Sequence, residues 1–377
     1  MNNKLFEMFF ILAQLKVYLH ILDCNTKNIL VAPLNWGIGH ASRCVPIIRE
    51  LEKNGYTPLL ASDGNSLELL RKEFPHLSVL TLPSYHIEYA KNARDFKGKL
   101  IKNSPKIIKA IISENRIVKK WITEYAIHGI ISDNRLGVYH KSIPSIYITH
   151  QLKVLSGKTT WLSTLLHHHF IKKFRECWVP DYEEKPNLSG KLGHLKDPNL
   201  TLKYVGPLSR LSKIDIPIQY QLMVILSGPE PQRTLLEEIL IREITNYTGR
   251  VVFIKGIFEK EQKIEHVGTV TYYNYMTSTE IEHTINSSEI VLCRSGYTTI
   301  MDLAKLQKSA FYIPTPGQFE QEYLAKKLKR AGIAPYAKQH RFRIENLLEV
   351  GLYTSQSQFF LEPDWANLFE VFEQPIK

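Results

Sequence analysis

Two glycine-bearing turns carry residue types that suit the binding of an anion. The first, at residues 35–43, follows the apolar run 29–32, and the second, at residues 293–299, follows the apolar run 290–292. In both places a short β-prone run ends in small residues and enters a segment of helical periodicity, so backbone N–H groups at a helix N-terminus face a crevice. Two such half-sites predict a ligand held between two domains.

The first turn also contains a group capable of acid–base chemistry. Gly37 and Gly39 let the backbone approach a ligand, and His40 stands at the mouth of the turn, where an imidazole suits proton transfer near neutral pH. The same turn would serve a dinucleotide-binding enzyme in which Asp63, at the end of the next predicted strand, reads a ribose. A histidine is not needed for dinucleotide binding, so we favour a catalytic role for His40.

Two further side chains follow predicted strands directly. Asp133 comes after the run 129–132, and His150 comes after the run 145–148. The carboxyl ends of parallel strands are the favoured side for ligands, so both side chains are expected at the same crevice. The alternative for Asp133 is an Asx turn or an ion pair with Arg135.

The elements that must position these residues fall into two alternating series. The first set of β-like runs covers residues 29–32, 57–62, 78–82, 129–132, 145–148, 176–179 and 202–205. The second set covers residues 222–226, 251–254, 269–273, 289–292 and 310–313. Strands that alternate with helix-period segments predict parallel, doubly wound α/β sheets.

A proline-rich stretch at 206–217 separates the two series and is the best linker candidate. The chain has 377 residues, which is enough for two cores of ordinary size. We therefore predict an N-terminal extension at 1–27, a first Rossmann-like domain at 28–208, a second at 218–345, and a C-terminal tail at 346–377 that packs back on the first domain.

Cysteine and histidine usage argues against a metal or disulfide framework. The four cysteines form no C-x-x-C pair, which favours buried, reduced thiols in a cytosolic protein. His167, His168 and His169 are consecutive rather than one helical turn apart, so a metal site is not expected there.

The net charge of +11 is concentrated in the first half of the chain. Residues 1–210 hold 30 lysines and arginines against 17 acidic residues, and the segment 91–120 holds ten basic residues beside isoleucines at helical spacing. The segment 155–175 repeats the pattern. In either segment alone, the apolar residues would be interpreted as a core face and the lysines as solvated. Two such segments in one domain favour a surface that binds an anionic membrane. The interleaved residues are mostly not stacking aromatics, which disfavours nucleic acid.

The N-terminal segment 1–27 is apolar but is interrupted by Glu7, Lys16 and His20. It makes a poor membrane span, and no small-residue cleavage pattern of a secretory signal follows. An interfacial helix and a plain extension of the first domain both remain open.

Three motifs of the second half narrow the chemistry. A loop at 227–233 is followed by the turn at 294–304 and by the proline- and glutamine-rich segment 314–325. Together they resemble the nucleotide-sugar half of GT-B glycosyltransferases, in the family that includes the MurG N-acetylglucosaminyltransferase and the diacylglycerol galactosyl- and glucosyltransferases. The resemblance covers most of residues 28–345. It implies a GT-B fold with two Rossmann-like, doubly wound domains facing each other across a cleft.

The resemblance also implies roles for single residues. Ser295, Gly296 and Thr299 match the loop that cradles the donor diphosphate, Asp302 matches the acidic residue that binds the donor ribose, and Gln321 matches a glutamine that contacts the donor. Glu320 departs from the histidine common in relatives. The implied donor-binding set is Ser227, Gly228, Arg233, Arg294, Ser295, Gly296, Thr298, Thr299, Asp302, Gln318 and Gln321. The acceptor-side set is Asn35, Trp36, Gly37, Gly39, Asp133 and His150, with His40 as the catalytic residue.

The implied reaction is transfer of a hexose or N-acetylhexosamine from a UDP-sugar to an acceptor hydroxyl, on a lipid or a lipid-linked envelope glycan. No D-x-D motif is present, so no metal or other cofactor is expected. The expected location is cytoplasmic and peripheral, at the inner face of the cell membrane. Two alternatives stay open: a UDP-sugar 2-epimerase on the same scaffold, and a non-catalytic basic protein that binds membrane or nucleic acid.

Overall fold

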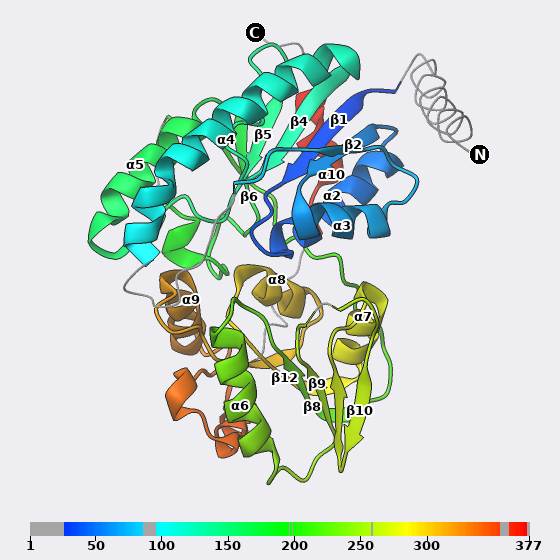
Figure 1. The fold of residues 1–377 in the computed structure, drawn as a ribbon, viewed down its shortest axis with the longest axis vertical. Coiled ribbons are helices and arrows are strands. Elements are labelled where there is room, and N and C mark those ends of the chain that lie inside the picture. The colour runs from blue at the N-terminus through cyan, green and yellow to red at the C-terminus, as the bar shows by residue number, and fades with distance from the viewer. Residues whose placement is uncertain are drawn as a thin grey trace, which may run out of the picture.

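A computed structural model describes residues 26–85, 96–195, 197, 199–257, 259–354 and 362–374. Most of the predicted N-terminal extension, with Cys24, and the basic residues Lys91 and Arg94 lie outside the described residues. Within these ranges the chain forms two parallel-sheet domains stacked end to end, which confirms the predicted fold class (Figure 1).

The first domain is built on a seven-stranded parallel sheet of order β3-β2-β1-β4-β5-β6-β7. Its strands are β1 (Asn28–Pro33), β2 (Thr57–Ser62), β3 (Val79–Thr81), β4 (Ile127–Asp133), β5 (Ser145–Ile148), β6 (Glu176–Val179) and β7 (Leu202–Tyr204). Its helices are α2 (Gly39–Lys53), α3 (Gly64–Glu73), α4 (Phe96–Glu124), α5 (Thr160–Ile171) and the short 3-10 turns η1 (Gly157–Thr159) and η2 (Gly190–Leu192).

The second domain has a six-stranded sheet of order β10-β11-β9-β8-β12-β13. Its strands are β8 (Tyr220–Ile225), β9 (Val251–Ile254), β10 (Ile264–Val267), β11 (Val270–Tyr273), β12 (Ser288–Cys293) and β13 (Ser309–Tyr312). Its helices are α6 (Gln232–Ile244), α7 (Ser278–Asn286), α8 (Tyr297–Lys305), α9 (Phe319–Arg330), η3 (Gln339–Arg341) and η4 (Ile344–Leu352). The antiparallel edge strand β10 was not predicted, because all four of its residues are exposed and show no inward-facing period.

Alternation along the central strands fills a core on each face of each sheet. In β1, Ile29 and Val31 join the core under α2 and α3, whereas Leu30 and Ala32 join the core under α4. Strands buried on both faces read as continuous apolar runs, which is why the sequence marks them so clearly. Cys44, Cys177 and Cys293 are buried free thiols within these cores.

The later part of the predicted tail returns to the first domain, whereas residues 346–352 lie in η4 of the second domain. Helix α10 (Trp365–Phe369) and the turn η5 (Glu370–Phe372) place Leu368, Phe369 and Phe372 in the same core as β1. A side chain at Gly129 of β4 would collide with the Phe372 ring, so a glycine is required where the tail packs on the sheet. The two sheets are thus joined by the linker 206–219 and by the returning tail.

Both sheets present the carboxyl ends of their strands to the junction between the domains. Strand order reverses between β1 and β4 in the first sheet and between β8 and β12 in the second. Ligands of open α/β sheets bind at such switch points. His40 lies in the first turn of α2 after β1, Asp133 ends β4, and Ser227 and Ser295 lie in the loops after β8 and β12, so the fold brings the predicted half-sites to the junction.

Candidate active site at the domain junction

The glycine-rich turn after β1 delivers His40 to the second domain. Gly37 has φ +74°, a left-handed conformation that favours glycine, and it reverses the chain from β1 into α2. A Cβ atom on Gly39 would lie 2.8 Å from Thr298 Oγ1 of α8. Glycine at this position therefore lets the two domains approach within contact distance.

His40 and Asp133 form a hydrogen-bonded dyad. His40 Nδ1 lies 2.8 Å from Asp133 Oδ1, and the Asp133 side chain is fully buried. Arg43, one turn further along α2, donates to both Asp133 oxygens through Nε and Nη2. The structure therefore brings together two of the predicted residues and adds an arginine that the sequence analysis did not single out.

His150 carries the network across the junction. Its Nδ1 lies 3.1 Å from Arg43 Nη1, and its Nε2 lies 2.9 Å from Glu320 Oε1 of α9 in the second domain. Gln151 Nε2 also donates to Glu320. The His150 ring stacks on Tyr297 at 4.2 Å, with the two planes 8° apart. The residue that departs from the family pattern, Glu320, is thus the one that pairs with the first domain.

Burial and charge set the protonation of these groups. Burial lowers the pKa of His40 below its ordinary value of 6.5, the Arg43 charge lowers it further, and the Asp133 carboxylate opposes both. Burial opposes ionisation of Asp133, but Arg43 and His40 outweigh it and hold the pKa of the carboxyl low. His40 is therefore neutral and Asp133 ionised at neutral pH, as general-base chemistry requires.

The predicted donor half of the site lies at the N-terminus of α8. Gly296 precedes this helix, no side chain caps its first turn, and no acidic residue lies there. The uncapped amides at Tyr297, Thr298 and Thr299 carry the positive end of the helix dipole, which suits a diphosphate. Ser295 is fully buried and donates its hydroxyl to the Gln321 carbonyl, so it fixes the turn against α9.

The loop after β8 lies beside this helix end. Gly228 has φ +105° and faces Thr315, whose hydroxyl is buried and has no partner within the described chain. Ser227 precedes it in the same loop. Both were predicted from the sequence as donor-binding residues, and that role stays a prediction.

Arg233 is a correction to the predicted donor set. It lies in the first turn of α6, and its guanidinium is paired with Glu230 at 2.5 Å and with Glu237 at 2.6 Å. It also donates to the Lys255 carbonyl. These partners come from its own loop and helix, so Arg233 fixes the start of α6 instead of facing a diphosphate.

Arg294 is a second correction. Its guanidinium is 1% exposed and donates to the backbone carbonyls of Ile313 and Gln232. Burial lowers its pKa to about 10. Arg294 links three loops of the second domain through these hydrogen bonds. Because its guanidinium is buried, its charge can affect a ligand only through the protein interior and not by direct contact.

Three predicted donor residues lie on the flanks of this site. Asp302 of α8 accepts the Ser209 hydroxyl from the linker, and burial raises its pKa to about 6. Gln318 caps α9 by accepting the Gln321 N–H at 2.8 Å. The Gln321 side-chain oxygen accepts the Thr315 N–H at 2.9 Å, so this glutamine is held by the loop after β13.

Asn35 is used within the first domain. Its side chain donates to Asp63 and accepts the Ser66 N–H, which closes the N-terminus of α3. It therefore shapes the acceptor-side turn and does not face the junction freely. Trp36 is 37% exposed at the surface of the same turn.

A buried ion cluster behind the turn was also missed. Arg135 is fully buried and donates to Asp63 and Glu114, and its Nε donates to the Pro33 carbonyl. The Asp133–Arg135 ion pair considered from sequence is not formed; Asp133 pairs with Arg43 instead. The sequence did contain a signal that Arg43 lies beside His40: it is three residues further along, and residues three apart share one face of a helix.

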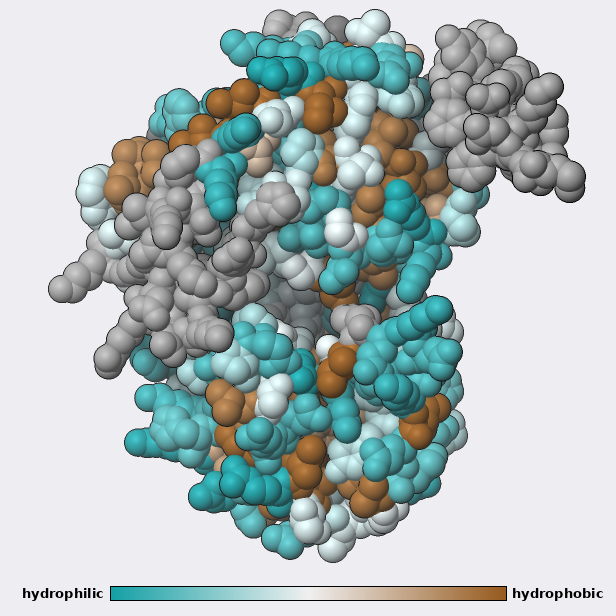
Figure 2. Space-filling view, in the orientation of Figure 1, coloured by the Kyte–Doolittle hydropathy of each residue, from teal (hydrophilic) through white to brown (hydrophobic). Residues whose placement is uncertain are grey.

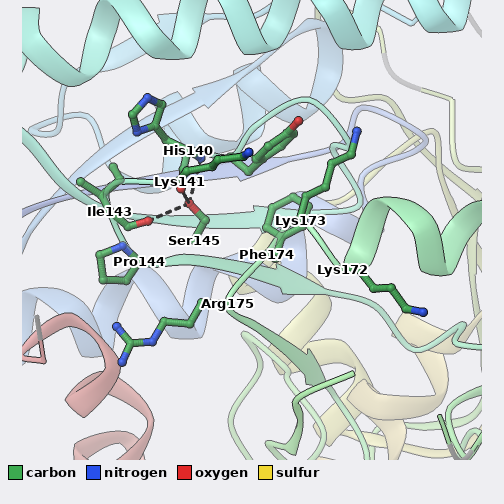
Figure 3. A pocket seen from close by; sticks show the side chains of 10 residues that line it. His140, Lys141, Ile143, Pro144, Ser145, Lys172, Lys173, Phe174 and Arg175 are labelled. Atoms are coloured by element: carbon green, nitrogen blue, oxygen red, sulfur yellow. Dashed lines mark hydrogen bonds between the residues drawn. The ribbon is translucent and has the colours of Figure 1, made fainter. Parts of the chain in front are cut away.

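A hollow in the first domain lies away from this site. It has a volume of about 760 Å³ and lies at the opposite ends of β5 and β6, where Lys141, Lys172, Lys173 and Arg175 line it (Figure 3). Its basic side chains diverge, and Arg175 donates to Gln374 of the tail. Among the residues described, no group of three or more His, Cys, Asp or Glu side chains is arranged to hold a metal ion.

Comparisons with known proteins agree with this geometry. Residues 234–367 match the glycosyltransferase family 28 C-terminal domain. The chain is 22% identical over 344 residues to a UDP-N-acetylglucosamine–N-acetylmuramyl-(pentapeptide) pyrophosphoryl-undecaprenol N-acetylglucosamine transferase of Haemophilus ducreyi, covering 86% of this chain and 89% of that protein. It is 19% identical over 306 residues to an uncharacterized glycosyltransferase of Methanopyrus kandleri, covering 76% and 85%.

Solved structures give the same fold. The Acinetobacter baumannii MurG structure aligns with a TM-score of 0.56 at 12% identity, covering 92% of this chain and 99% of that one. The spinosyn rhamnosyltransferase SpnG aligns with a TM-score of 0.62 at 13% identity, covering 92% and 100%. The family 28 domain and the curated relatives favour a transferase over the epimerase and binding-protein alternatives. The chain is a glycosyltransferase with a GT-B fold, and its residues 234–367 match the family 28 C-terminal domain.

Proposed function

We propose that this enzyme transfers a hexosyl or N-acetylhexosaminyl group from a UDP-sugar to a hydroxyl of a lipid or lipid-linked acceptor. The observation that carries the proposal is the His40–Asp133 dyad, which faces the uncapped N-terminus of α8 across the domain junction. The first domain would supply His40 as the base for the acceptor hydroxyl, and the second domain would supply the α8 amides that bind the diphosphate.

The proposed mechanism uses the two halves in one displacement. His40 Nε2 takes the proton of the acceptor hydroxyl while its Nδ1–H donates to Asp133. The acceptor oxygen bonds to the sugar carbon, the bond from that carbon to the diphosphate oxygen breaks, and the electron pair leaves with the diphosphate. The α8 amides stabilise the charge that develops on this leaving group.

A UDP donor and a metal-free reaction are parts of the same proposal. The printed name of the Haemophilus ducreyi relative contains UDP-N-acetylglucosamine, and Asp302 lies on α8 one turn beyond the phosphate-facing amides, where a ribose would follow. Helix-end amides supply the positive potential that a divalent ion provides in other transferases. No metal is therefore assigned a role.

An apolar and cationic face of the first domain supports a membrane-bound acceptor. Trp161, Leu162, Leu165 and Leu166 of α5 are all exposed and lie on one side of the helix. Phe170 of α5 packs near Ala110 and Ile111 of α4, so the two helices adjoin, and Ile108 and Ile112 of α4 are exposed as well. Figure 2 shows apolar atoms on the upper-left shoulder of the molecule, over α5 and the neighbouring part of α4.

Basic side chains surround this apolar face. Lys106 and Lys109 lie on α4, and Lys172 and Lys173 follow α5 at the edge of the 760 Å³ hollow. Exposed apolar residues beside lysines suit the interface of an anionic bilayer. Within the described ranges, no helix combines the length and the apolar character needed to cross a membrane. The proposed location is therefore peripheral, at the inner face of the cell membrane.

The reaction is tested by incubating the enzyme with radiolabelled UDP-glucose, UDP-galactose or UDP-N-acetylglucosamine and with vesicles of extracted lipid, in the presence of a metal chelator. One donor should give a labelled product in the lipid phase. The His40→Ala variant should lower kcat by about 10²–10⁴-fold, the range for a general base, while UDP affinity measured by calorimetry stays unchanged. Unimpaired transfer by that variant would remove His40 from the mechanism, and conversion of the free UDP-sugar to its 2-epimer would favour the epimerase alternative.

A further inference from the structure

Arg43 contacts three titratable side chains from three different elements. Its guanidinium binds both oxygens of Asp133 at the end of β4. Its Nη2 lies 2.9 Å from His40 Nδ1, and its Nη1 lies 3.1 Å from His150 Nδ1. The Arg43 side chain is 1% exposed, so water screens these contacts little.

His40 Nδ1 therefore faces two groups with opposite demands. The Asp133 carboxylate can only accept a hydrogen bond, so it favours a protonated Nδ1 and a charged imidazolium. The guanidinium can only donate, and its positive charge disfavours the imidazolium. The balance between these two contacts decides whether the imidazole is neutral.

Two further titratable groups face His40, and one of them, His150, also lowers the pKa of His40. His150 faces it from the loop after β5, and Glu320 faces it from α9 of the second domain. These two are hydrogen-bonded to each other at 2.9 Å. Arg43 is thus the positive group placed directly between His40 and its carboxylate partner.

We propose that Arg43 is a positioning residue that sets the protonation of His40: its positive charge offsets the Asp133 carboxylate and also disfavours the imidazolium directly, so the imidazole stays uncharged at neutral pH and able to accept a proton. The inference rests on the proposed function insofar as His40 is the base of the transfer reaction. An unopposed carboxylate would fix the ring equally well but would hold it protonated, which would leave no lone pair on Nε2 for the acceptor hydroxyl.

The direct test is the pKa of His40 in the free protein, measured by NMR titration and assigned against the His40→Ala spectrum. Arg43→Gln should raise this pKa by about one unit or more, because the carboxylate loses its counter-charge. Arg43→Lys keeps the charge and should restore a value near that of the unmodified protein. The acidic limb of kcat/KM should move to higher pH in Arg43→Gln by the same amount, and activity should recover at alkaline pH.

Arg135→Gln is the matched control. Arg135 is as buried as Arg43 and is also paired with carboxylates, but its partners are Asp63 and Glu114. Its replacement should disturb the fold to a similar degree and leave the pKa of His40 unchanged. A folded Arg43→Gln protein with an unshifted or lowered His40 pKa would overturn the proposal.

A second pair of variants covers the case in which Arg43→Gln does not fold, since it leaves Asp133 buried without its partner. In the Asp133→Asn background that charge is absent, and adding Arg43→Gln should still raise the pKa of His40. No rise would overturn the proposal. A raised pKa with an unmoved pH–rate profile would support the role of Arg43 and would instead contradict His40 as the base.

Discussion

At the scale of single residues, Asp302 is the group through which we expect donor binding to depend on pH. Its carboxylate accepts the hydroxyl of Ser209 in the linker, and burial raises its pKa to about 6. Only the ionised form accepts hydrogen bonds from two ribose hydroxyls. The neutral form predominates below about pH 6, so donor affinity should increase as pH rises through that value.

Calorimetry with UDP at pH 5 and pH 8 tests this. Asp302→Ala should weaken UDP by about 1.5–3 kcal/mol at pH 8, as expected for lost charged hydrogen bonds. In Asp302→Asn, UDP affinity should no longer change with pH, apart from the change that comes from titration of UDP itself. Ser209→Ala removes a hydrogen bond that lowers the pKa of the carboxyl, so it should move the midpoint upward. An identical pH profile in Asp302→Asn and the unmodified protein would exclude Asp302 from the donor site.

At the scale of elements, α5 is unusual because its large apolar side chains face outward. Trp161 is 69% exposed and Leu165 is 61% exposed, whereas the inward face of the helix holds His168 and Ile171. His168 is held by Asp197 at 2.9 Å and by the Leu152 carbonyl, so the helix is fixed in this orientation by polar contacts. Four exposed apolar residues on one helix suit insertion into a bilayer interface.

The double variant Trp161→Ser, Leu165→Ser should therefore lower vesicle affinity at least about tenfold, since each buried side chain contributes roughly 1.5–3 kcal/mol. The free energy of unfolding should change by less than about 0.5 kcal/mol, because both side chains are exposed. Co-sedimentation with anionic vesicles measures the effect. Leu348→Ser, Leu352→Ser is the control, since these leucines are 82% and 84% exposed on the second domain. Equal losses in both variants would refute a docking role specific to α5.

At the scale of the whole molecule, the tail makes the stability of the first domain depend on the last residues of the chain. Phe369 and Phe372 are buried beside Trp178 and β1, and Lys27 Nζ donates to the Phe372 carbonyl at 3.1 Å. Across the junction, Tyr297 donates its hydroxyl to the Pro180 carbonyl at 2.7 Å. The two domains are therefore coupled by direct contacts at the junction and also through the tail.

Phe372→Ala should lower the free energy of unfolding of the first domain by about 3–5 kcal/mol, as for other buried phenylalanines. Hydrogen exchange should report faster opening of β1 and β4 but not of β13. Phe342→Ala is the matched variant, because Phe342 is fully buried in the core of the second domain against Phe311. It should show the opposite pattern. If Phe372→Ala lost hydrogen-exchange protection only in the tail, the stability of the first domain would not depend on the tail.

The sequence by itself determined the two sheets, the order of their central strands along the chain and the positions of the two glycine-bearing turns. Parallel strands buried on both faces are continuous apolar runs, and Gly37 and Gly296 stand where strand turns into helix, so local pattern was sufficient. It also identified His40, Asp133 and His150 as residues at strand ends. Edge strand β10 was not predicted from the sequence, because a strand exposed on both faces shows no apolar alternation.

Only the tertiary structure decided which charges meet. Asp133 pairs with Arg43 rather than with Arg135. Glu320 and His150, 170 residues apart, meet across the junction. An ionic side chain finds its partner through distance and burial in the folded chain. When the partners lie on different elements, spacing along the sequence gives neither their distance nor their burial. The set of side chains that meet at the candidate active site therefore followed from the packing of the two domains.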